Sequence, residues 1–156
     1  TLLEQTGDLI GAEEQYRHMV RYGREKYAPG DVRTCAVMML LAGSLSKQGR
    51  DAEAEPLYRE ALAAFIAGRP PGHRQIGQSR DALVACLVAQ EKFADAEPLL
   101  LAHEESTRAA ETPVPDRQAA VGALVAFYES WHEAEPGGGH DAQATKWRAA
   151  QSTPPE

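Results

Sequence analysis

Residues Gly49 to Phe65 read G-R-D-A-E-A-E-P-L-Y-R-E-A-L-A-A-F, and the same pattern occurs twice more in the chain at one fixed spacing. Forty-two residues later, Glu91 to Leu100 read E-K-F-A-D-A-E-P-L-L. Forty-two residues earlier, Gly7 to Tyr16 read G-D-L-I-G-A-E-E-Q-Y. Three copies in one register indicate a repeat array, in which each structural unit packs only against its neighbours.

The composition of the 156 residues is that of a globular protein, with 43% hydrophobic and 25% charged residues. Aromatic residues are only 6%, which favours closely packed helices over sheets. The net charge of −7 argues against a nucleic-acid partner, whose phosphates require clustered Lys and Arg, and against an anionic membrane surface. The sequence contains no apolar run long enough to span a membrane, so we expect no membrane insertion.

The spacing of apolar residues in steps of three and four predicts helices throughout the chain and no strand. Proline and glycine clusters separate these helices, and Asp31 and Asp116 are expected to cap two of them. Residues 2–5 resemble the last turn of a helix, so we interpret the chain as a piece of a longer protein. We expect one repeat domain over residues 1–151 and a disordered tail over residues 152–156. The predicted helices cover residues 8–26, 32–48, 51–67, 75–90, 93–108, 117–132 and 141–151.

The repeated stretch resembles the tetratricopeptide repeat. Small residues such as Ala54 and Ala61 stand where two helices of a pair touch, and the aromatic Tyr58 stands where a pair meets the next one. The period of 42 residues and the run A-E-P-L-Y-R-E-A-L are similar to the kinesin light chain variety of this repeat. The resemblance covers nearly all of residues 7–132. It implies an all-α fold, a right-handed superhelical solenoid of about three to four antiparallel helix pairs.

A narrower resemblance lies toward the end of the chain. The runs A-D-A-E-P-L-L-L-A-H-E (94–104), L-V-A-F-Y-E-S-W (124–131) and K-W-R-A-A-Q (146–151) are similar to repeat arrays that follow bacterial serine/threonine protein kinase domains. Residues 133–140 insert a Gly-rich loop that those relatives lack. None of the kinase catalytic motifs is present in this sequence.

In tetratricopeptide arrays the first helix of each pair lines a concave groove that binds extended peptides, and the resemblance implies the same groove here. Two known recognition modes of such grooves depend on asparagine, which this sequence lacks. Met38 and Met39 offer either an adaptable apolar contact or ordinary core packing, and the sequence leaves both readings open. The candidate peptide-binding residues are Ala36, Met39, Gly43, Lys47, Gln78, Asp81, Ala85, Val88 and Glu129.

The sequence contains no convincing catalytic, metal or cofactor site. The five histidines form no pair with metal-ligand spacing, although His132 and His140 flank the Gly-rich loop. Carboxylates such as Glu13 and Glu14 are expected on solvated helix faces near helix N-termini. Cys35 and Cys86 each stand in an apolar stretch, which favours two buried free thiols over a disulfide.

These observations predict a non-catalytic interaction or scaffolding module, with no cofactor, from a larger bacterial signalling protein such as a serine/threonine kinase. The expected partner is a protein or peptide segment held in the concave groove. The alternative is self-association, with the terminal repeats of two copies stacking on each other. The unpaired cysteines favour a cytoplasmic location, while a membrane-anchored parent would permit a location outside the cytoplasm.

Overall fold

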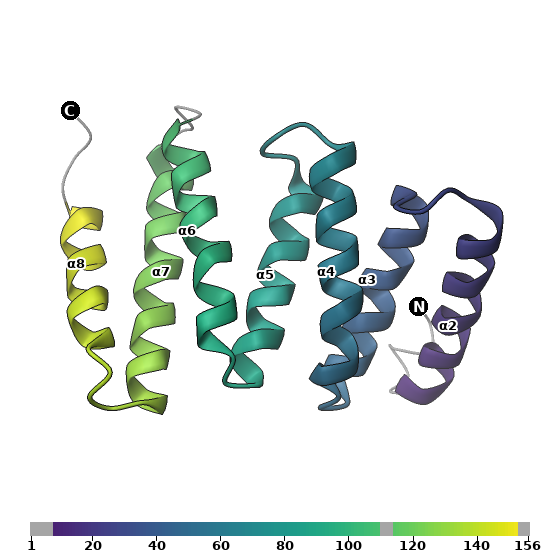
Figure 1. Cartoon of the computed structure of the whole chain (residues 1–156), viewed down its shortest axis with the longest axis horizontal. Helices are drawn as coiled ribbons and strands as arrows, with labels where there is room; N and C mark the ends of the chain where they lie inside the picture. The colour runs from purple at the N-terminus through teal and green to yellow at the C-terminus, as the bar shows by residue number, and fades with distance from the viewer. Residues whose placement is uncertain (1–7, 110–113, 153–156) are drawn as a thin grey trace. The chain divides into compact units, whose positions relative to one another are not determined.

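The computed structural model describes residues 8–109 and 114–152, and within them every regular element is an α-helix (Figure 1). The predicted all-α fold class is therefore confirmed. The chain divides into two compact units, residues 1–90 and residues 91–156. The expectations for residues 2–5 and for residues 153–156 of the tail lie outside the described residues, whereas Ser152, predicted to start the disordered tail, is the last residue of a helix.

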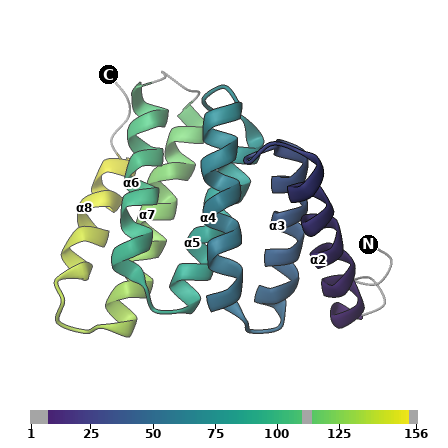
Figure 2. The same cartoon turned by 45° about the vertical axis from the view of Figure 1, so that its right-hand side comes forward.

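The described residues of the first unit form four helices that lie side by side in chain order (Figures 1 and 2). Helix α3 packs against α2 and α4, and α4 packs against α3 and α5. The helices are α2 (Leu9–Lys26), α3 (Val32–Lys47), α4 (Asp51–Gly68) and α5 (Arg74–Ala89). Their core is aliphatic and aromatic, and includes Tyr16, Val20, Met38, Leu41, Leu45, Ala54, Tyr58, Ala61, Leu62, Phe65, Leu83 and Leu87.

The second unit contains α6 (Phe93–Ala109), α7 (Val114–Ala134) and α8 (His140–Ser152). Helix α7 packs against both α6 and α8. Phe127 lies among the rings of Phe93, Tyr128 and Trp131, with ring-centre distances between 5.3 and 6.0 Å. The ring of His140 stacks on Trp131 at 3.9 Å, so the start of α8 is held by an aromatic contact with α7.

The tight turns that follow α3 and α5 use a left-handed residue at the same repeat position. Gly49, with φ of 73°, follows α3, and the N–H groups of Gly49 and Arg50 donate to the carbonyl oxygens of Ser46 and Leu45 at 2.9 and 3.0 Å. This is the hydrogen-bond pattern of a helix that ends at a left-handed glycine. Forty-two residues later the left-handed position is taken by Glu91, with φ of 58°. A side chain at this position carries a conformational cost that glycine avoids.

Of the two predicted helix caps, one is wrong and one is confirmed. The helix predicted to start after Asp116 begins earlier, at Val114, so Asp116 is not at its N-cap position and Pro115 falls in the first turn, where an N–H group is not needed. Pro56 and Pro98 lie inside α4 and α6, past the first turn, so each removes one helical hydrogen bond. Asp31 does cap α3, and its carboxylate accepts a hydrogen bond from the N–H of Arg33 at 2.9 Å.

Candidate protein-interaction surfaces

The candidate groove residues of the first unit lie on two neighbouring helices that contact each other directly, α3 and α5. On α3 the residues are partly accessible or exposed: Ala36, Met39 and Gly43 are half-buried and Lys47 is exposed. On α5 the corresponding residues are more open: Gln78, Asp81 and Ala85 are exposed and Val88 is half-buried. The structure thus brings eight of the nine residues onto one pair of helices.

The ninth residue, Glu129, belongs to the second unit. Glu129 is an exposed residue of α7 in the second unit, where its carboxylate accepts a hydrogen bond from the guanidinium of Arg148 on α8. This ion pair between Glu129 and Arg148 lies within the second unit and gives Glu129 a structural role that the sequence did not indicate. The use of all nine residues in ligand binding stays a prediction.

Leu40 is a feature of this surface that the sequence analysis missed. The apolar run from Met38 to Leu41 divides between two environments, because Met38 and Leu41 are 1% and 3% exposed whereas Leu40 is 47% exposed. Met38 is therefore core, while Met39 and Leu40 give α3 an accessible apolar strip. The signal in the sequence was the helical step of about 100°, which turns Leu40 away from both of its buried neighbours.

A second surface is an open groove between α2 and α4, with a volume of about 660 Å³. Its floor consists of buried apolar side chains, Val20, Leu41 and Leu45. Two ion pairs cross from α2 to α4, Arg17 to Glu53 at 3.4 Å and Arg24 to Glu60 at 2.7 Å. All four of these charged side chains are about half exposed, so each ion pair contributes little to stability.

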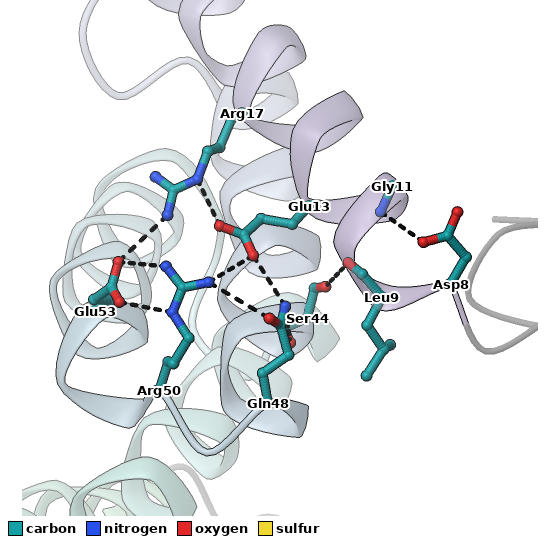
Figure 3. Close-up of polar contacts among 9 residues, drawn as sticks. All are labelled: Asp8, Leu9, Gly11, Glu13, Arg17, Ser44, Gln48, Arg50 and Glu53. Atoms are coloured by element: carbon teal, nitrogen blue, oxygen red, sulfur yellow. Dashed lines mark hydrogen bonds and ion pairs between the residues drawn. The ribbon is translucent and has the colours of Figure 1, made fainter.

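Glu13 lies at the centre of a polar cluster beside this groove (Figure 3). Its carboxylate accepts hydrogen bonds from Arg17 at 2.8 Å, Arg50 at 2.7 Å and Gln48 at 3.0 Å. Burial alone would raise the pKa of Glu13, but the hydrogen bonds from Arg17 and Gln48 and the charge of Arg50 lower it below its ordinary value. The expectation of a solvated carboxylate is wrong for Glu13, whose side chain is only 11% exposed.

The same contact recurs one repeat later. Glu55 accepts a hydrogen bond from Gln90 at 3.1 Å and pairs with Arg59 at 2.9 Å, just as Glu13 does with Gln48 and Arg17. In both copies the glutamine also donates to the carbonyl oxygen four residues before it. The repeated contact ties the start of one helix to the end of the helix that follows. The sequence could have revealed it, since Glu, Arg and Gln recur at these positions.

The described residues contain no cluster of three His, Cys, Asp or Glu side chains that would hold a metal ion. Cys35 and Cys86 are buried and unpaired with each other, as expected. Burial is the main cause that raises the pKa of both thiols, that of Cys86 to about 11, so neither is activated as a nucleophile. Within the same residues no helix has the length and apolarity needed to cross a bilayer.

The helix pair α3–α4 carries the family signal. Residues 34–66 match the tetratricopeptide repeat family. The match begins in α3 and ends in α4, so one tetratricopeptide unit coincides with one antiparallel pair, with α3 as its first helix. The match supports the interpretation of the chain as a tetratricopeptide repeat protein. Tetratricopeptide repeats generally mediate protein–protein interaction or scaffolding. No curated protein matches the sequence.

Proposed function

We propose that this chain is a non-catalytic protein–protein interaction module that binds a protein segment on the surface formed by α3 and α5. The observation that carries the proposal is the accessible apolar strip of α3, the first helix of the matched repeat. Met39 and Leu40 supply flexible and branched apolar side chains, and the small residues Ala36 and Gly43 beside them leave room for a ligand side chain. Ala85 continues the small, uncharged character of this surface onto α5.

The expected ligand follows from this chemistry. Among the candidate residues of this surface, Lys47 is an exposed cation and Asp81 is an exposed anion, and the centre is apolar. Such a surface favours a ligand with an uncharged apolar anchor over a strongly acidic or basic segment. The sequence has no asparagine to grip a peptide backbone or a terminal carboxylate. Binding therefore rests on burial of an apolar side chain.

We further propose that the parent is a bacterial signalling protein such as a serine/threonine kinase. The support is the resemblance of residues 94–104, 124–131 and 146–151 to the repeat arrays of such kinases. The sequence of the complete gene tests this proposal, since a kinase domain encoded before Thr1 is the expected result. A gene without a kinase domain would contradict it.

Binding experiments test the α3–α5 surface. The immobilised chain is used to isolate partners, and the strongest is then titrated in purified form against Met39→Glu and Ala85→Glu. Both substitutions should weaken binding about tenfold or more, because each places a charge where an apolar side chain is buried. Ile66→Glu is the matched control, since Ile66 is 58% exposed on α4. Unchanged affinity for both groove variants would refute this surface.

A second candidate function is self-association through the terminal repeats. The observation that favours it is the exposure of large apolar side chains on α2, where Met19 is 49% and Tyr22 is 51% exposed. Monomeric mass at high concentration would contradict it.

A further inference from the structure

The groove between α2 and α4 contains an arginine that has no partner among the described residues. Arg17 and Arg24 of α2 each pair across the groove with a glutamate of α4 that lies 36 positions later in the chain. Arg21 lines the groove between them, but the residue at the same interval is the apolar Leu57. Arg21 forms no hydrogen bond or ion pair with any residue that the structure describes, although Glu25 lies one turn further along α2. The groove therefore presents an exposed guanidinium to an anionic ligand group.

The side of α2 that borders this groove stays open when a helix precedes it in the repeat. Helix α4 packs against its own preceding helix, α3. The residues of α4 at the repeat positions of Arg21 and Arg24 are Ala63 and Ile66. Both are exposed, and Ile66 is 58% exposed. The exposure of Arg21 and Arg24 is therefore expected in any repeat of this array, whatever lies before α2.

The repeat separates the packing residues of the groove from its charged residues. The floor residue Leu41 corresponds to Leu83 in the next repeat, and both are buried. Three charged residues of the groove, Arg21, Arg24 and Glu60, do not recur. The residues at their positions in the next repeat are Ala63, Ile66 and Ala102. Repeat packing thus requires the apolar floor but not these charges, which favours a role for the charges in recognising a ligand.

The two ion pairs limit the size of the ligand group that enters the groove. Their arginines are seven residues apart on α2, which corresponds to about 10 Å along the helix. Between the pairs, Pro56 and Leu57 of α4 are accessible apolar residues, and Arg21 lies on the opposite wall. An apolar side chain with a carboxylate next to it matches this opening. Its carbon atoms would contact Pro56 and Leu57, and its carboxylate would accept hydrogen bonds from the guanidinium.

We propose that this groove binds a segment of a partner protein in which a large apolar residue stands next to an aspartate or glutamate. The apolar side chain packs against Pro56 and Leu57, and the acidic side chain pairs with Arg21. Charge complementarity selects an acidic segment, because a basic segment would bring like charge against Arg21. The groove is open along two helices and does not enclose a small molecule, so a protein segment is the occupant that fits it.

This surface is distinct from the α3–α5 surface. Leu41 of α3 lies on the floor of the groove, whereas Met39, two residues before it, is turned by about 200° around the helix axis. Substitutions at Met39 and at Arg21 therefore act on different faces of the first unit. Binding in the groove can be lost while binding on the α3–α5 surface persists, and the reverse also holds.

The experiment begins with a displayed library of random short peptides, which is selected on the unchanged chain and counter-selected on Arg21→Gln. The enriched peptides should contain an aspartate or glutamate next to a large apolar residue. The strongest peptide is then synthesised with a fluorescent label and titrated by anisotropy. Arg21→Gln should weaken its binding about fivefold or more, and so should replacement of the peptide's acidic residue by its amide. The two changes together should cost no more than either one alone, because they remove the same contact.

Two variants serve as controls. Arg59→Gln removes an exposed arginine of α4 that does not line the groove, and it should leave the affinity unchanged. Met39→Glu should also leave it unchanged, since it alters the α3–α5 surface. Circular dichroism checks that every variant keeps its helices.

Each other outcome overturns the proposal. Selection that yields no peptide dependent on Arg21, or enriched peptides without an acidic residue, excludes the groove as a site for acidic segments. Loss of binding in Met39→Glu places the peptide on the α3–α5 surface. Displacement of the peptide by an equimolar amount of octanoate shows that the groove takes a free acid and not a protein segment.

Discussion

Two adjacent leucines of α3 provide a controlled test of how the first unit is packed. Leu41 is 3% exposed and Leu40 is 47% exposed, although they share a helix, a residue type and a helix propensity. Replacing each of them by alanine therefore compares a buried leucine with a half-exposed leucine while the helix, the residue type and the helix propensity stay the same. The substitution Leu41→Ala removes the equivalent of three buried methylene groups, which corresponds to about 2.4 kcal/mol of lost transfer free energy.

The cavity left by Leu41→Ala adds little to this cost. Leu41 lies on the floor of the open groove between α2 and α4, so water can enter the space that the side chain leaves. We therefore expect a loss near the lower end of the range of about 2–5 kcal/mol observed for buried leucines. Because Leu40 is half exposed, Leu40→Ala should lower the free energy of unfolding by roughly half of this transfer free energy, about 1.2 kcal/mol.

The assay is urea denaturation followed by two signals. Circular dichroism reports on the helices of both units, whereas tryptophan fluorescence reports on the second unit alone, because Trp131 and Trp147 are the two tryptophans of the chain. Because Leu41 belongs to the first unit, the loss of stability caused by Leu41→Ala should appear in the unfolding curve that is followed by circular dichroism. Equal costs for Leu40→Ala and Leu41→Ala, or a cost below about 1 kcal/mol for Leu41→Ala, would refute the assigned packing of α3.

Three further predictions concern a turn, a carboxylate and the thiols. Glu91→Gly should raise the free energy of unfolding by about 1 kcal/mol, because glycine adopts the positive φ of this turn without strain, and a decrease in denaturation midpoint would contradict this. The pKa of Glu13 is lowered from 4.5, so its contribution to stability is present above pH 4.5 and is lost as the pH falls through the folded-state pKa. The thermal unfolding temperature of Glu13→Gln should thus fall less on acidification than that of the unchanged chain. An equal fall in both would contradict the stabilising role of the Glu13 carboxylate. Because burial raises the pKa of Cys35 and Cys86, neither should react with a thiol reagent at neutral pH before unfolding, and fast labelling of the native chain would show that they are accessible.

The helices and their order could be predicted from the sequence because the repeat period fixes where each apolar face begins. Every predicted helix is present among the described residues, with ends shifted by at most a few positions. The largest shift is at α7, where Pro115 looked like a break and instead lies in the first turn. Proline has no N–H group in either setting, so its presence alone does not distinguish a break from a start.

Exposure was harder to predict than secondary structure. An apolar residue on a helix is buried only if another helix covers it, and the sequence of one helix does not state how many neighbours it has. Met19 and Ala61 occupy the same repeat position, yet Met19 is 49% exposed and Ala61 is 0% exposed. Glu13 shows the reverse case, because a carboxylate that looked solvated is enclosed by an arginine of its own helix and by Gln48 and Arg50 of the turn between α3 and α4. The apolar α3–α5 surface could be proposed only through the family resemblance.

The recurring glutamate–glutamine contact has a consequence for how such a chain can change in length. In both copies the two residues are 35 positions apart. Removing one whole period between helix pairs, or inserting one, leaves a glutamate facing a glutamine at the same separation. A duplication of any other length would bring unlike residues together and leave a carboxylate without its donors. Gene duplication can therefore add or remove one whole repeat without disturbing this buried contact.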